Sequence, residues 1–414
     1  MNFFSLFSGI AGVGFLVAIL TLAQNFGLAI IMEDDDFGIY AYYQSFLMLF
    51  LNFIPFGSGL LITFALYKKS DKEFEKFFNV NLFYLLFLTT VFCLVIYVLF
   101  KSFFTQLYDS TLMIYVILQA YLSSIILTFS VYLRSKQMLK LYGTHFIFYA
   151  FIILVCSYFG YLTSKSIVGV YLSVCIGLFL FSIYTLYLVR KYIGLDLSLE
   201  GSYKELKKSL KYGFPVVGGS MGMSLLTQGD RILAGISYSI KDLNTYAIAA
   251  LLASTFLFVV NNFASTWTAF IAKEMAGKNI EEIYEHYRSK VKLLFLILPL
   301  IFIVYLLQYV IYFIFFQTKA PNISLVIMIL TSSYGLYLAS KFFIAYLNLM
   351  NQNKRVFQST FIGLSVAFSL FFVLDDMNPL YRLSIIVFCG FFIQYFFCHQ
   401  FTKNYFKKLK IKKN

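Results

Sequence analysis

The stretch LLFLILPLIFIVYLLQYVIYFIFF at residues 293–316 holds twenty-four residues in succession and no charged side chain. A helix of about 20 apolar residues is long enough to cross the ~30 Å hydrocarbon core of a bilayer. The whole chain has the same character, because 60% of its 414 residues are hydrophobic and only 13% are charged. Soluble domains carry about 25% charged residues. The composition therefore predicts an all-α integral membrane protein.

Short charged or turn-rich segments separate twelve apolar stretches, each of which is predicted to be a membrane-spanning helix. Their predicted bounds are 5–32, 37–66, 77–100, 111–133, 141–163, 166–189, 212–237, 245–272, 291–316, 322–348, 356–374 and 379–402. An even number of crossings places both ends of the chain on the same side of the membrane.

The basic residues indicate which side this is. Alternate connections and the C-terminal tail hold 26 lysines and arginines, whereas the opposite connections hold 5. Because Lys and Arg concentrate on the cytoplasmic side of membrane proteins, both termini and the 190–211 connection are predicted to be cytoplasmic. The net charge of +14 comes from these short clusters, which build no basic domain, so nucleic acid is not an expected partner.

The two halves of the chain resemble one another in register. Residues 36–41 read DFGIYA and residues 242–247 read DLNTYA, which is an offset of 206. Residues 132–134 and 346–348 read YLR and YLN, which is an offset of 214. Transporters are commonly built from duplicated bundles of this kind.

A duplication predicts two six-helix lobes related by a pseudo-twofold axis along the membrane normal, with the substrate path between them. The N-lobe is predicted at 1–189 and the C-lobe at 212–402. A cytoplasmic linker at 190–211 joins them, and a basic tail follows at 403–414.

Lys292 and Arg382, which lie within four residues of a span end, are counted with the connections, and three charged residues then remain inside the predicted spans: Asp230, Arg231 and Lys341. Each costs roughly 2.5–3.5 kcal/mol near the bilayer centre on insertion scales, so each is expected to face water or a partner. The repeat counterparts of the first two, Gln24 and Asn25, are uncharged, which predicts a cavity with one specialised wall. Arg231 and Lys341 are candidate binding groups for an anionic substrate. Asp230 is a candidate for ion coupling or for a structural ion pair, and snorkelling is the structural alternative for Lys341.

Uncharged polar side chains in the apolar helices are further candidates for lining a cavity. They are Gln24, Asn25, Asn52, Gln228, Asn261 and Asn262. Trp267, the only tryptophan of the chain, is expected to anchor the inner end of its helix at the membrane interface.

The sequence contains no motif that is typical of a catalytic or metal-binding site. The three histidines are scattered without metal-ligand spacing, and the five cysteines lie singly in apolar stretches. No phosphate-binding loop or nucleophile motif is present. Because every external connection is about ten residues or shorter, there is no room outside the membrane for a catalytic domain. We expect no catalytic residue, no metal and no cofactor.

Two short motifs carry a family resemblance. Residues 35–40 read DDFGIY and lead through the second span to a basic, amphipathic segment at 67–78. The start of the seventh span reads KYGFP at 211–215, followed by QGDR at 228–231. Both resemble the Wzx-type O-antigen and polysaccharide flippases, a polysaccharide transport branch of the MOP exporter superfamily with a MATE-like fold.

The resemblance implies a flippase in the bacterial cytoplasmic (inner) membrane. Its substrate would be an undecaprenyl-pyrophosphate-linked oligosaccharide, an O-antigen or capsule repeat unit, moved from the cytoplasmic to the periplasmic leaflet by alternating access. The implied partners are this polyprenyl-pyrophosphate-linked glycan, membrane lipids, H⁺ or Na⁺ as a coupling ion, and polysaccharide polymerase or assembly proteins.

Two alternatives remain open from the sequence. A MATE-like, cation-coupled exporter of drugs or lipids shares the architecture, and fold alone does not fix function. A membrane glycan polymerase or ligase belongs to a different class, and such an enzyme usually presents a large external loop with catalytic residues.

Overall fold

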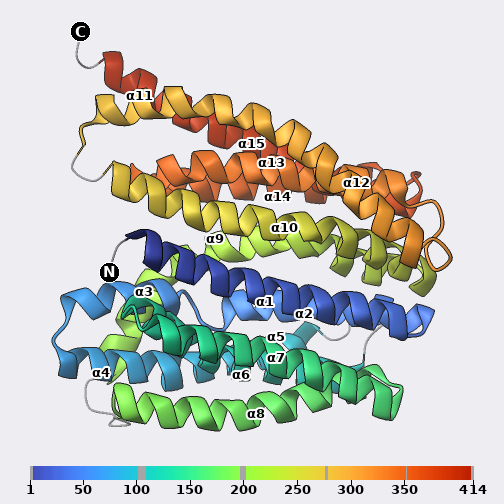
Figure 1. The fold of residues 1–414 in the computed structure, drawn as a ribbon, viewed down its shortest axis with the longest axis horizontal. Helices are drawn as coiled ribbons and strands as arrows, with labels where there is room; N and C mark the ends of the chain where they lie inside the picture. Colours follow the sequence, from blue (N-terminus) through green and yellow to red (C-terminus); the bar gives the residue numbers. More distant parts are fainter. Residues whose placement is uncertain (1–2, 101–108, 196–201, 276–277, 351, 412–414) are drawn as a thin grey trace. The chain divides into compact units, whose positions relative to one another are not determined.

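The computed structural model describes residues 3–100, 109–195, 202–275, 278–350 and 352–411. Throughout these ranges the regular secondary structure is helical and no β-strand occurs (Figure 1). The predicted all-α fold is therefore confirmed.

In the first half of the chain the elements are α1 Phe3–Ile31, α2 Asp34–Phe53, α3 Ser58–Lys68, α4 Asp71–Asn79, the π-helix η1 Val80–Leu85, α5 Leu86–Phe100, α6 Ser110–Ser135, α7 Leu139–Ser164 and α8 Ile167–Tyr192. In the second half they are α9 Ser202–Ser237, α10 Ile240–Glu274, α11 Ile280–Lys290, the 3₁₀-helix η3 Val291–Leu296, α12 Ile297–Phe315, α13 Ser324–Leu349, α14 Asn353–Val373 and α15 Pro379–Ile411.

Ten helices within the described ranges are long and apolar enough to cross a membrane. This agrees with a multi-pass membrane protein. The two remaining predicted spans, 37–66 and 212–237, fall on helices outside these ten. The first is divided between α2 and α3, and the second lies on α9, which carries several glycines and the charged pair Asp230 and Arg231.

The break between α2 and α3 follows from a proline and a glycine. Pro55 has no backbone N–H to continue the helix, and Gly57 has a φ of 72°, a left-handed conformation that suits glycine. Thr89 of α5 donates a hydrogen bond to the carbonyl oxygen of Ile54 at 2.7 Å, which satisfies a backbone group near the break. An irregular backbone inside a membrane requires such partners.

Gly213 of α9 lies against this break. A Cβ atom at Gly213 would collide with the backbone carbonyl oxygen of Phe56, which cannot move aside as a flexible side chain can. We predict that Gly213→Ala lowers the stability of the folded protein by about 1–3 kcal/mol through overpacking. The measurement is thermal unfolding of the purified protein in detergent.

The matched control for this prediction is Gly219→Ala, six residues further along the same helix. Among the described residues, no atom outside the local helix backbone lies within 4 Å of a Cβ built at Gly219. Its stability is expected to stay unchanged or to rise, because Ala is the better helix former. Equal melting temperatures for the two variants would contradict the close approach at Gly213.

The predicted linker region contains the beginning of α9. Glu205 accepts hydrogen bonds from Lys69, at the end of α3, at 3.0 Å and from Lys208 at 2.9 Å. Burial acts to raise the pKa of the Glu205 carboxyl, but the hydrogen bonds from the two lysines outweigh it and hold the pKa below its usual value. The carboxylate therefore stays charged and attaches the start of α9 to α3.

Contacts between Cα atoms group the chain into two compact units. The first contains residues 1–224 and 231–240, and the second contains residues 225–230 and 241–414. In the first unit α7 packs on α1 and α8, and α6 packs on α2 and α8. In the second unit α15 packs on α13 and α14, and α12 packs on α13. The division into six-helix lobes at 1–189 and 212–402 stays a prediction.

Each half also contains a short amphipathic helix, most of which lies in a connection between two predicted spans. Both α4 and α11 begin with a capping box, formed by Ser70 with Glu73 and by Asn279 with Glu282 at an offset of 209. Each is followed by a non-α segment, η1 or η3, that leads into an apolar helix. The internal repeat therefore extends to these connecting helices.

Candidate functional site

The embedded carboxylate Asp230 lies inside the second unit. It belongs to α9 and is 4% exposed. The hydroxyl of Tyr246 on α10, which is fully buried, donates a hydrogen bond to its Oδ2 atom at 2.6 Å. A short hydrogen bond to a charged oxygen is among the stronger polar contacts in proteins. The bond fixes the position of the Asp230 side chain between two helices.

The first unit contains the repeat counterpart of this contact. Gln24 and Tyr40 precede Asp230 and Tyr246 by 206 residues each. The Nε2 atom of Gln24 donates to the hydroxyl of Tyr40 at 3.1 Å and to the hydroxyl of Ser157 at 2.9 Å. The same pair of positions is therefore joined in both halves, once through a neutral amide and once through a carboxyl group.

This recurrence supports the internal duplication, because the contacts between side chains follow the same offset of 206 as the repeated sequence motif. It also distinguishes the packing role of the side chain at position 230 from the role of its ionisable group. An amide fulfils the packing role in the first half. The carboxyl group is therefore specific to the second half.

The two embedded cations are both partly exposed. Lys341 lies on α13, and its Nζ atom is 4.7 Å from the ring centroid of Tyr337, one turn earlier. A cation over an aromatic face is attracted by about 0.5–1 kcal/mol at exposed sites. Arg231 follows Asp230 on α9. Neither cation is sealed in a protein core, so both keep surface that a ligand can contact.

The other predicted lining residues are placed differently. Asn52 of α2 donates to the hydroxyl of Ser224 at 2.7 Å and to the carbonyl oxygen of Met48 at 2.9 Å. Asn25 and Gln228 are half-buried, Gln24 is buried, and Asn261 is exposed. The side chain of Asn262 lies outside the described residues. Gln24 and Asn52 therefore join helices within the first unit.

Sequence reasoning missed the roles of Tyr40 and Tyr246. Both appear in the repeated motif, so their shared offset with Gln24 and Asp230 was a usable signal. It also missed Arg382, which was counted with an external connection. Arg382, in the first turn of α15, is 4% exposed, and its Nη1 atom lies 2.7 Å from the Oδ1 atom of Asp375 in the connection between α14 and α15.

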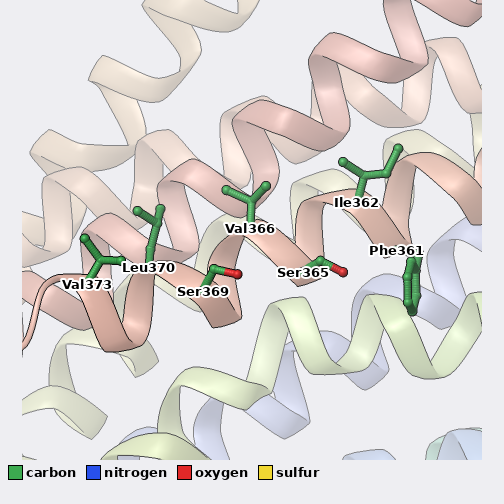
Figure 2. Close-up of a pocket in the computed structure, with 7 residues that line it drawn as sticks. All are labelled: Phe361, Ile362, Ser365, Val366, Ser369, Leu370 and Val373. Atoms are coloured by element: carbon green, nitrogen blue, oxygen red, sulfur yellow. The ribbon is translucent and has the colours of Figure 1, made fainter.

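A shallow apolar groove lies along α14, with a volume of about 330 Å³ (Figure 2). The residues that line it are Phe361, Ile362, Ser365, Val366, Ser369, Leu370 and Val373. None of the predicted site residues is among them. No residue of this lining is charged, so the groove does not supply the positive charge that attracts an anionic headgroup.

Residues 6–269, close to two thirds of the chain, match the model of a family described as Polysaccharide biosynthesis protein. No curated protein sequence matches the chain. Solved structures, by contrast, match it over nearly its full length.

The eukaryotic MATE transporter AtDTX14 has a TM-score of 0.70 at 13% identity, over 99% of this chain and 98% of that one. A multidrug resistance MATE family transporter of the MOP superfamily, in an inward-facing conformation, has a TM-score of 0.69 at 15% identity, over 97% and 99% of the two chains. A MOP superfamily transporter from Pyrococcus furiosus has a TM-score of 0.68 at 12% identity, over 98% and 96%. These identities establish a shared fold.

Proposed function

The chain belongs to the polysaccharide biosynthesis protein family and has the MOP-type transporter fold, and from this premise we propose that it is a lipid-linked oligosaccharide flippase. Its substrate is an undecaprenyl-pyrophosphate-linked O-antigen or capsule repeat unit. The protein moves this substrate from the cytoplasmic to the periplasmic leaflet of the bacterial inner membrane by alternating access.

The observation that carries this proposal is the pair of partly exposed cations, Arg231 and Lys341, each of which is the only basic residue of its predicted span, 212–237 or 322–348. The pyrophosphate of a lipid-linked glycan carries negative charge into a region where hydration is lost. Arginine binds phosphate oxygens through two parallel N–H bonds, and lysine acts as a point charge. Each cation offsets part of the cost of moving the pyrophosphate across the bilayer.

Asp230 is the proposed coupling group. A buried carboxyl group binds a proton or Na⁺ when its site closes to water, and it releases the ion when the site opens. Tyr246 holds the Asp230 carboxyl in place at 2.6 Å. The ion gradient would then bias the direction of transport.

Deletion of the gene tests the function. Without the flippase, the lipid-linked repeat unit is expected to accumulate on the cytoplasmic leaflet, and the surface glycan is expected to disappear. Surface glycan is measured by immunoblotting, and the leaflet is determined by accessibility to an added glycosidase in spheroplasts. Unchanged surface glycan in a strain without a second flippase would exclude the proposal.

A cation-coupled drug exporter is the second candidate, and the buried acid Asp230 favours it because such exporters bind a cation at an embedded carboxylate. Cells that overproduce the protein would then tolerate higher concentrations of cationic drugs, and Asp230→Asn would abolish the tolerance. A flippase predicts equal drug sensitivity with the wild-type protein and with the variant.

A further inference from the structure

The amphipathic helix α11 is attached to the second unit through one histidine. The Nε2 atom of His286 lies 2.9 Å from the Oε2 atom of Glu274, the last residue of α10. The Nδ1 atom of the same ring lies 2.9 Å from the hydroxyl oxygen of Tyr346 on α13. His286 therefore connects three helices through both of its ring nitrogens.

The surroundings of this histidine are aromatic. The ring of Trp267 is nearly parallel to the imidazole at a centroid distance of 6.5 Å, and it also stacks on Phe342 at 5.1 Å. Trp267 is 7% exposed and Tyr346 is fully buried. The side chain of His286 itself retains 11% exposure, so protons reach it while most of its surface is packed.

The two contacts suit either protonation state of the ring. When His286 is neutral, Nε2–H donates to Glu274 and Nδ1 accepts from the Tyr346 hydroxyl. When His286 is protonated, Nδ1–H donates to the same hydroxyl oxygen, which is both donor and acceptor. The change requires only that the O–H bond of Tyr346 rotates. No heavy atom has to move to accept the proton.

Burial lowers the pKa of His286 below its usual value, and the carboxylate of Glu274 acts against this effect because it favours the protonated ring. With neutral His286, the group carries the single negative charge of Glu274, and with protonated His286 its net charge is zero. The other charged groups that act on His286 are Lys278 and Lys290, which oppose protonation. From α15, Phe406 packs against α11 and adds no charge.

We propose that Glu274, His286 and Tyr346 form a proton-binding site that joins α11 to α10 and α13. The ligand is one proton, taken up by the imidazole and balanced by the carboxylate. The packing of α11 in the second unit is thereby linked to pH. This inference does not depend on the transported substrate, because the site is defined within one unit and apart from Arg231 and Lys341.

The chain carries its own reporter for this site. Trp267 is the single tryptophan, so the tryptophan emission of the purified full-length protein comes from the ring beside His286. Emission is measured as a function of pH in lipid nanodiscs. We expect one transition between pH ~5 and ~8, where imidazole groups titrate. His286→Gln, which keeps hydrogen-bonding capacity but binds no proton in this range, is expected to abolish it.

Two further variants identify the groups that control the transition. Glu274→Gln removes the opposite charge and is expected to lower the midpoint by about 1 unit or more. His399→Gln is the control, because this histidine lies against Phe343 and Tyr395. It is expected to leave the midpoint unchanged.

The proposal is overturned if wild-type emission shows no transition, or if the same transition persists in His286→Gln. If His286→Gln does not fold, Glu274→Gln decides, and an unchanged midpoint then overturns the proposal. The flippase assignment is tested separately by surface glycan. A protein that moves no glycolipid would still show the emission change.

Discussion

Replacement of both embedded cations, Arg231→Ala with Lys341→Ala, is expected to reduce glycolipid transfer between leaflets by at least 100-fold. A hydrogen bond to a charged group contributes about 1.5–3 kcal/mol, and each ~1.4 kcal/mol corresponds to a tenfold change in rate. Each single variant is therefore expected to lose roughly 10- to 100-fold. The measurement is the rate of leaflet transfer of the lipid-linked glycan in proteoliposomes.

Charge-conserving variants separate this effect from misfolding. Arg231→Lys and Lys341→Arg keep the positive charge and are expected to retain most of the transport. Lys341→Met keeps an unbranched apolar chain over the Tyr337 ring without the charge, so it is expected to fold normally and to transport poorly. Wild-type transport by the double alanine variant would show that neither cation contacts the substrate.

Asp230→Asn is expected to abolish ion-driven transport while the protein remains folded. The reason is visible in the other half of the chain, where the amide of Gln24 makes the corresponding contact with Tyr40. An amide at position 230 can bond to Tyr246 in the same way, so the change in stability should stay within about 1 kcal/mol. Without an ionisable group, however, the site binds no coupling ion.

The measurement compares transport with and without an imposed pH or Na⁺ gradient. Wild-type protein is expected to respond to one of the two gradients, and Asp230→Asn to neither. The reverse change, Gln24→Glu, removes the N–H donor that serves Tyr40 and Ser157 and buries a second acid. It should destabilise the first unit. An undiminished gradient response in Asp230→Asn would exclude this residue as the coupling group.

The membrane character of the chain and its duplication could be predicted because both depend on local sequence. Mean hydropathy over about 20 residues indicates whether a segment is surrounded by water or by lipid. The hydrocarbon core of the bilayer is apolar throughout, so the same criterion applies to every span. Each of the ten apolar helices overlaps one predicted span. The repeated motifs contain Tyr40 and Tyr246 at equivalent positions, but their hydrogen bonds were not predicted.

Other features depend on packing between distant segments, which hydropathy does not report. The span 37–66 was predicted as one helix, but Pro55 and Gly57 divide it, and Thr89 supplies the hydrogen bond that makes the break tolerable. The interface anchor predicted for Trp267 was wrong, because aromatic residues of α13 and the imidazole of α11 cover its ring. Covering partners of this kind are not adjacent in the sequence.

The contacts Gln24–Tyr40 and Asp230–Tyr246 also bear on how such proteins diverge after gene duplication. Two copies of one bundle begin with the same side chains, and selection on packing alone would keep them alike. When one copy preserves the architecture, the other is free to exchange a neutral group for an ionisable one with little structural consequence. New specificity can therefore arise through single substitutions in one copy, and comparison of equivalent positions within one chain identifies where this has happened.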